Sequence, residues 1–357
     1  MLVFGGGGVR GIAYAGILKE LALKHKFDFY SRDRNITHCI GTSIGALFAA
    51  LVVIGVNVAE MERLVASHDL ASSICIDASR FVTALQSWGI SSSGPLENWI
   101  DKAISQKIGK SDITMLQLYR LTSVKLTVVV TNITDNCAEY WSYETHPEMR
   151  VAYAVVASMS LPPLFPPRQI IRTIRRETVR CNLLSNLPLR IGDTVSVASG
   201  ETGVVARICG YDAIVDVSRR ILCVDGGLRD NFAIRHAAVE DPQSILGLKV
   251  NWACANSIST LDRYVARLAY CALSVAEDTV TQSMPAELRS RILSCDVGDI
   301  STVDFNLSAE VVIELLNRGA RAAQNFIGLT RDASTQTDPI PLLTCDRRDL
   351  PVEQEKI

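Results

Sequence analysis

Hydrophobic and polar positions near the start of the chain predict strands that are each followed by a helix. Leu2–Phe4 form a short β-type run, and apolar residues recur with helical spacing over residues 9–24. The same succession returns at residues 36–40, with an apolar helix beginning at Ala46. Two β-turn-α units in succession predict an α/β fold with a mainly parallel sheet and helices on its faces.

The rest of the chain continues this pattern. Further strands are predicted at residues 125–132, 221–224 and 245–251, and helices at residues 263–282 and 309–326. The longest apolar run, residues 44–56, is shorter than the ~20 residues of a membrane-spanning helix, so we predict a buried core helix. Residues 329–357 turn polar and charged, and we predict a flexible tail there.

One stretch breaks the alternation. Residues 187–216 are dense in Val, Ile and Thr and are punctuated by glycines, which predicts several short strands with tight turns. The amino-acid sequence of this stretch resembles the start of small SH3-like barrels of the KOW kind. We therefore predict a small all-β insertion at residues 169–220 within a catalytic domain formed by residues 1–168 and 221–328.

The segment leading into this insertion is basic. On a helix, the spacing of Arg168, Arg172, Arg176 and Arg180 would form one basic stripe able to lie on anionic lipid. The alternative is a solvated basic link into the β module. A nucleic-acid role for the insertion has less support than either of these interpretations, because the insertion has few aromatic residues to stack on bases.

Composition narrows the function classes. Lys plus Arg number 36 and Asp plus Glu 38, a net charge of −2 that excludes a globally basic nucleic-acid binder. The ten cysteines are scattered without zinc-ligand spacing, so reduced thiols and no metal are expected. The first residues lack a secretory signal, which favours the cytoplasm.

Residues 41–45 read Gly-Thr-Ser-Ile-Gly and fit G-x-S-x-G between a predicted strand and a predicted helix. Flanking glycines let the backbone turn sharply enough to expose Ser43 as a nucleophile at the edge of the sheet. The alternative is a glycine-rich turn in which the serine merely caps the helix. The motif alone leaves both open.

Residues 5–11 contain G-x-G-x-x-G directly after the first strand. This pattern is typical of a dinucleotide site, in which an acidic residue that binds the ribose lies at the end of the second strand. Here the candidate acid, Asp28, comes before the second strand, which argues against that interpretation. Backbone N–H groups gathered at a helix start would equally stabilise the oxyanion of an acyl-transfer intermediate. The nearby Ser43 favours that second use.

A serine hydroxyl needs a base, and Asp225 is the candidate. It follows the predicted strand 221–224 and precedes Gly226 and Gly227, so it lies where open α/β sheets place their sites. An ordinary Asp-Gly turn is the alternative. His236 would complete a Ser, Asp, His order, but it more simply begins a helix.

Together these motifs resemble the patatin-like phospholipase family, whose members use a Ser-Asp dyad. Residues 112–119, 151–166, 231–232 and 304–308 also resemble family segments, and the similarity runs from residue 2 to about 328 except for the insertion. The resemblance implies a three-layer α/β/α fold. It places the nucleophile on Ser43, the general base on Asp225, the oxyanion hole on Gly6, Gly7 and Gly8, and supporting roles on Arg10, Gly11, Gly41, Gly45, Gly226 and Gly227.

The resemblance further implies a lipid acyl hydrolase that cleaves fatty-acyl esters of phospholipids or lysophospholipids through an acyl-enzyme, without a cofactor. Contact with membranes would be peripheral, with residues 72–95 as a cover over the cleft. Some secreted effector relatives need a host partner, which would dock here on the insertion. The rival interpretation is a catalytically silent lipid-binding or assembly module. A third interpretation is a nucleotide-binding α/β protein.

Overall fold

The computed structural model describes residues 1–25, 36–73, 88–181, 189–197, 202–251, 281, 283–298, 300 and 307–334. Its centre is a parallel sheet of strands in the order β10-β9-β1-β2-β3. These strands are β1 (Leu2–Phe4), β2 (His38–Thr42), β3 (Lys125–Asn132), β9 (Leu246–Asn251) and β10 (Ile292–Asp296). The predicted mainly parallel sheet is confirmed for this centre, while β3 is flanked by antiparallel strands.

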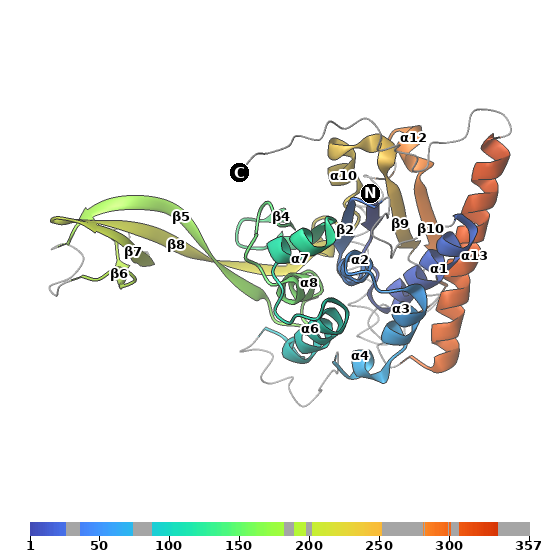
Figure 1. The fold of residues 1–357 in the computed structure, drawn as a ribbon, viewed down its shortest axis with the longest axis horizontal. Helices are drawn as coiled ribbons and strands as arrows, with labels where there is room; N and C mark the ends of the chain where they lie inside the picture. The colour runs from blue at the N-terminus through green and yellow to red at the C-terminus, as the bar shows by residue number, and fades with distance from the viewer. Residues whose placement is uncertain are drawn as a thin grey trace, which may run out of the picture.

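Helices cover both faces of the sheet (Figure 1). Alternate residues of β1 divide between two apolar clusters, with Leu2 and Phe4 in one and Val3 in the other. The described helices are α1 (Ala13–His25), α2 (Ile44–Val53), α3 (Val58–Val65), α4 (His68–Ser73), α6 (Gly94–Ile108), α7 (Met115–Thr122), α8 (Val151–Ser158), α10 (Ile234–Glu240), α12 (Ala286–Arg289) and α13 (Ala309–Ser334). The larger cluster joins α1, α2, α6, α8 and α13, and the smaller one joins α10 and α12. The three-layer α/β/α fold is thus confirmed.

Helix α2 is the buried helix that the apolar run predicts. All ten of its residues are buried, and Ser43 immediately precedes it. On the outer side of this layer, α1 packs closely against α13: a Cβ on Gly16 would lie 2.0 Å from the Leu316 carbonyl oxygen. Only glycine permits so close an approach of the two helix backbones.

A long β arm projects from the body beyond β3 (Figure 1). Strand β8 (Asp212–Asp225) pairs with β3 at its carboxyl end and with β5 (Arg168–Arg180) along its length. Strands β7 (Thr202–Cys209) and β6 (Thr194–Ser196) complete an antiparallel sheet at the far end. This end has an apolar cluster of its own, made of Val195, Val197, Val205, Ala213, Val215 and Val217. An SH3-like barrel stays a prediction.

The helical interpretation of residues 168–180 is wrong, because this segment is strand β5. Its β-branched Ile, Thr and Val residues favour a strand, and β8 supplies the pairing partner. A bulge between Thr173 and Arg175 shifts the register, so the arginines do not form one stripe.

The C-terminal helix is longer than the sequence pattern predicts. It continues to Ser334, so the first residues of the predicted tail are helical. The helix predicted at residues 263–282 and the family-like residues 304–306 lie almost entirely outside the described residues, as does most of the proposed cover at 72–95. Within the described part of the chain, no helix is long and apolar enough to span a bilayer.

Candidate active site

Ser43 occupies a sharp turn between β2 and α2. Its backbone has φ 55° and ψ −127°, a conformation that L-residues rarely adopt. The turn also needs its glycines, since a Cβ on Gly41 would lie 2.3 Å from the Gly45 carbonyl oxygen and one on Gly45 would lie 2.5 Å from the Phe4 carbonyl oxygen. The predicted strand-turn-helix setting of G-x-S-x-G is therefore present. The serine projects from a strained turn instead of capping the helix, because its side chain makes no capping hydrogen bond.

Ser43 and Asp225 lie side by side although 182 residues separate them in the sequence. The Ser43 hydroxyl donates to Asp225 Oδ2 at 2.6 Å, and Asp225 Oδ1 accepts the Gly227 N–H at 2.8 Å. Asp225 is only 4% exposed. Burial raises its pKa to about 6, while the hydrogen bonds from Ser43 and Gly227 act in the opposite direction. The carboxylate is thus available as a base near neutral pH.

Ser158 and Ser160 accept hydrogen bonds from the backbone N–H groups of Ser43 and Asp225, respectively. The Ser158 hydroxyl accepts the Ser43 N–H at 2.8 Å and donates to the Val129 carbonyl at 2.6 Å. The Ser160 carbonyl accepts the Asp225 N–H at 2.9 Å. Sequence reasoning assigned neither serine a role, although both lie in the family-like segment 151–166.

The glycine-rich loop lies against the serine turn. A Cβ on Gly6 would lie 3.3 Å from Ser43 Cβ and 2.2 Å from Asn231 Oδ1. The Gly6 N–H donates to the Asn231 carbonyl at 2.9 Å, so it is already engaged. Among the described residues, the N–H groups of Gly7 and Gly8 have no acceptor. Of the three predicted oxyanion donors, the geometry therefore leaves Gly7 and Gly8 free for the role.

Arg10 and Gly11 fix the helical turn that follows this loop. Arg10 is 6% exposed, and its Nε donates to the Ile300 carbonyl at 2.5 Å, so it is not a solvated surface charge. A Cβ on Gly11 would lie 2.6 Å from the Ile44 side chain, which would push the turn away from α2. Both residues connect the loop to the core beside Ser43.

The Asp-Gly-Gly turn shows the same tight packing. A Cβ on Gly226 would lie 2.3 Å from the Val129 carbonyl oxygen, and one on Gly227 would lie 2.8 Å from Asn231 Oδ1. Larger residues at either position would displace Asp225 from Ser43. The turn is therefore part of the site's architecture and not an ordinary surface turn.

His236 makes a different contact from the one a triad needs. Its ring stacks on Tyr140, with centroids 3.8 Å apart and an interplanar angle of 4°. The Tyr140 hydroxyl in turn donates to Asp230 Oδ2 at 2.7 Å. In the part of the chain that the structure describes, no histidine hydrogen-bonds to Ser43 or Asp225. The same part holds no group of three or more metal-ligating side chains.

The chain is an α/β protein with a Ser-Asp pair at the ends of two strands of its sheet. The serine lies on a strained turn between strand and helix, beside a buried carboxylate and a glycine-rich loop. The family model described as patatin-like phospholipase matches residues 2–238, about two thirds of the chain. The chain belongs to this family.

Two viral proteins are similar to part of this chain. The uncharacterized protein R571 of Acanthamoeba polyphaga mimivirus is 28% identical over 166 residues, 46% of this chain and 53% of that protein. The probable lipid hydrolase 463L of Invertebrate iridescent virus 6 is 26% identical over 166 residues, 46% of this chain and 54% of that protein. The alignments thus span about half the length of these relatives.

Two bacterial structures are similar over most of this chain. VipD from Legionella pneumophila is 17% identical with a TM-score of 0.49, and 92% of this chain and 66% of VipD are covered. The type III effector ExoU is 14% identical with a TM-score of 0.42, and the coverage is 92% and 52%.

Proposed function

We propose that the protein is a lipid acyl hydrolase that cleaves fatty-acyl esters of glycerophospholipids with Ser43 and Asp225. The observation that carries the proposal is the 2.6 Å hydrogen bond between the Ser43 hydroxyl and Asp225 Oδ2, made at a strained turn beside free backbone N–H groups. Membership in the patatin-like phospholipase family and the likeness to a probable lipid hydrolase support a lipid ester as substrate.

In the first half of the reaction, Ser43 Oγ attacks the ester carbonyl carbon while Asp225 Oδ2 takes the hydroxyl proton. The carbonyl oxygen becomes an oxyanion, which the N–H groups of Gly7 and Gly8 stabilise. The C–O bond to the glycerol then breaks. Asp225 returns its proton to the leaving alkoxide, and the acyl group stays on Ser43.

In the second half, water attacks the acyl carbonyl and Asp225 accepts a proton from it. Collapse of this intermediate breaks the bond to Ser43 Oγ, which regains the proton, and the fatty acid leaves. No step requires a metal or a cofactor. One carboxylate serves as base and acid in both halves, so a histidine is not needed.

The proposal places the protein at a membrane surface in the cytoplasm. The similarity to two viral proteins supports the host cytoplasm as its location. Phospholipid and lysophospholipid are both substrates in this proposal, and the β arm is the place where a protein activator or partner would dock. Nucleic acid is not expected as a partner.

The test is fluorophosphonate labelling together with fatty-acid release from mixed phospholipid vesicles. Ser43→Ala and Asp225→Asn should both abolish release, and Ser43→Ala should abolish labelling. His236→Ala is the matched control and should retain both. A native protein that neither labels nor releases fatty acid, even with cell extract added, would instead favour the catalytically silent lipid-binding module.

A further inference from the structure

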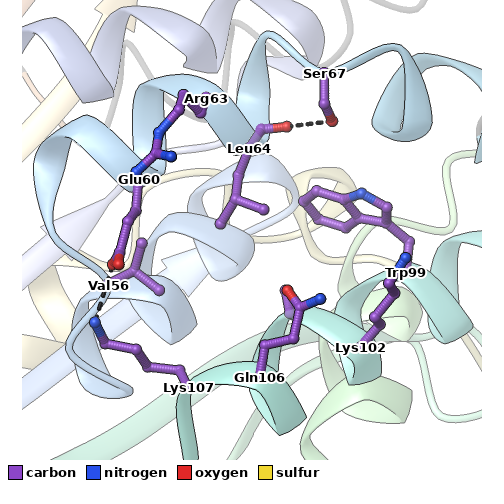
Figure 2. Close-up of a pocket in the computed structure, with 10 residues that line it drawn as sticks. Val56, Glu60, Arg63, Leu64, Ser67, Trp99, Lys102, Gln106 and Lys107 are labelled. Atoms are coloured by element: carbon purple, nitrogen blue, oxygen red, sulfur yellow. Dashed lines mark hydrogen bonds and ion pairs between the residues drawn. The ribbon is translucent and has the colours of Figure 1, made fainter.

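A groove separate from the Ser43 site lies between α3 and α6. Its volume is about 360 Å³, within the range of small-ligand sites. Figure 2 shows the Trp99 indole at one end, facing Leu64, and the ion pair of Glu60 with Lys107 at the other end. None of its lining residues belongs to the serine turn, the glycine loop or the Asp-Gly-Gly turn.

The groove has an excess of positive charge. Glu60 is its single lining acid, and Glu60 is held by Lys107 at 2.9 Å and by the Asn57 N–H at 3.1 Å. Its hydrogen bond with Lys107 lowers the pKa of Glu60, so both partners stay charged and cancel. Two further lining cations, Arg63 and Lys102, remain.

The other acids of the two helices are engaged away from the groove. Glu62 pairs with Lys19 at 2.9 Å, Glu97 pairs with Arg150 at 2.9 Å and with Arg168, and Asp101 accepts the Asp112 N–H at 2.9 Å. The Arg63 side chain bonds only to the Ala59 carbonyl, at 3.2 Å, and the Lys102 side chain has no hydrogen-bond partner among the described residues. A coulombic interaction with Arg63 also lowers the pKa of Glu60, but among the described residues no carboxylate forms an ion pair with Arg63 or Lys102. Three cations thus line the groove against one carboxylate.

The basic segment of the arm contrasts with the groove. Arg172 is bound by Glu139, Arg176 by Asp216 and Arg219 by Asp135. Including Arg168 and Arg175, five of the nine arginines at residues 168–220 form an ion pair with a carboxylate. The uncompensated charge beside a tryptophan and an apolar wall lies in the groove.

We propose that the groove between α3 and α6 binds the phosphate of an anionic phospholipid head group and holds the protein on a bilayer. Arg63 and Lys102 supply donors from two sides, as phosphate recognition requires. Trp99 and Leu64 offer apolar surface to the glycerol and upper acyl region, where tryptophan is favoured at membranes. The groove goes beyond the proposed function, because it concerns recruitment and not ester cleavage.

The experiment measures binding without cleavage. The full chain carrying Ser43→Ala is sedimented with vesicles of phosphatidylcholine alone and with vesicles that also contain phosphatidylglycerol. The test variant adds Arg63→Gln and Lys102→Gln. The matched control adds Arg180→Gln and Arg207→Gln instead, which removes the same charge from the exposed far end of the arm. Thermal unfolding verifies that each variant folds.

The native groove should favour the phosphatidylglycerol vesicles, and the Arg63 and Lys102 double variant should lose on the order of 30-fold in association with them. The arm control should keep the native value. Equal binding by the groove variant and the native protein, or an equal loss in the arm control, would overturn the proposal.

A second experiment distinguishes a lipid head group from a soluble phosphate ligand. Glycerol 3-phosphate is titrated while tryptophan fluorescence is compared between the Ser43→Ala chain and the same chain with Trp99→Phe added. A Trp99-dependent response without recruitment to vesicles would identify a soluble phosphate ligand and would overturn the bilayer proposal. Because every variant lacks Ser43, these outcomes do not depend on the proposed hydrolysis.

Discussion

The Ser158 hydroxyl accepts the backbone N–H of Ser43 at 2.8 Å and is itself anchored to the Val129 carbonyl at 2.6 Å. Ser158 is fully buried, at the end of α8, and Val129 belongs to the strand next to β2. This single hydroxyl therefore joins the strained turn to the sheet. It holds the backbone whose φ of 55° directs the Ser43 side chain toward Asp225.

We expect Ser158→Ala to slow fluorophosphonate labelling about tenfold or more, because a displaced nucleophile loses its alignment. The variant leaves a buried N–H and a buried carbonyl unpaired, which costs about 1–3 kcal/mol of stability. Ser160→Ala is the matched control, since that buried hydroxyl bonds only to the Val156 carbonyl. Equal labelling rates in the two variants would show that Ser158 does not position Ser43.

The pH dependence of activity should follow Asp225, whose pKa is about 6. The carboxylate is the active form, so the labelling rate should rise with pH through about 6 and fall about tenfold per pH unit below it. Labelling rates measured between about pH 4 and 8 test this expectation. A rate that is flat across this range would exclude Asp225 as the base.

Asp225 should also reduce stability. Its folded pKa of about 6 exceeds the unfolded value of about 3.9, so the folded state binds the proton more tightly and stability falls as pH rises between these values. Asp225→Asn removes the buried charge. We expect it to raise the free energy of unfolding by on the order of 2 kcal/mol at pH 7, with a smaller gain at pH 4. Urea denaturation at the two pH values measures this, and an equal change at both would contradict it.

The parts of the site that the sequence predicts are local. The strand-turn-helix around Ser43 follows from a short run of residues, and so does the turn after Asp225. Their pairing does not follow from the rule for parallel strands, because β8 runs antiparallel to β3. Asp225 reaches Ser43 because it lies opposite Val130, the residue after the Val129 that pairs with Thr42. The bond from Ser43 to Ser158 spans 115 residues, and no periodicity contains it.

Two other features depend on partners elsewhere in the chain. The Gly6 N–H is engaged by Asn231, which a glycine pattern does not reveal. The arginine spacing over residues 168–180 fits a helix as well as a strand, and pairing with β8 decides the matter.

His38 should make the protein sensitive to acid. Its ring is buried at the amino-terminal ends of β2 and β3 and is hydrogen-bonded to Glu240 at 2.9 Å and to Thr127 at 2.8 Å. Burial lowers its pKa to about 4, although Glu240 opposes this. The folded pKa lies below the unfolded value near 6.5, so the neutral ring stabilises the fold above that value and stability is lost as pH falls from about 6.5 to 4.

We therefore expect His38→Gln, which cannot titrate, to show a smaller loss of stability between pH 7 and pH 5 than the native chain, by on the order of 2 kcal/mol. Urea midpoints at the two pH values measure the difference. His146→Gln provides a comparison at a less buried histidine without a carboxylate hydrogen bond, whose pKa burial also lowers, and it should change the pH dependence less than His38→Gln. Parallel curves for the native and His38→Gln proteins would contradict the expectation.

The far end of the β arm should be dispensable for the chemistry at Ser43. Its apolar cluster is separate from the two clusters of the body, and its base is fixed by Arg172, which binds Glu139 at 2.9 and 2.7 Å. Thr173 and Ser218 face each other across β5 and β8. Replacing residues 174–217 by Asn-Gly would close these two strands with a two-residue turn of a favoured type.

We expect this shortened chain to keep the native labelling rate within about twofold, because the strand end that carries Asp225 and the base of the arm are unchanged. Adding Glu139→Gln provides the contrast: Arg172 then loses its carboxylate partner, and the shortened chain should unfold at lower urea concentration. Loss of labelling in a shortened chain that still unfolds cooperatively would show that the far end of the arm contributes to the active site, and the domain boundary at residues 169–220 would have to be abandoned.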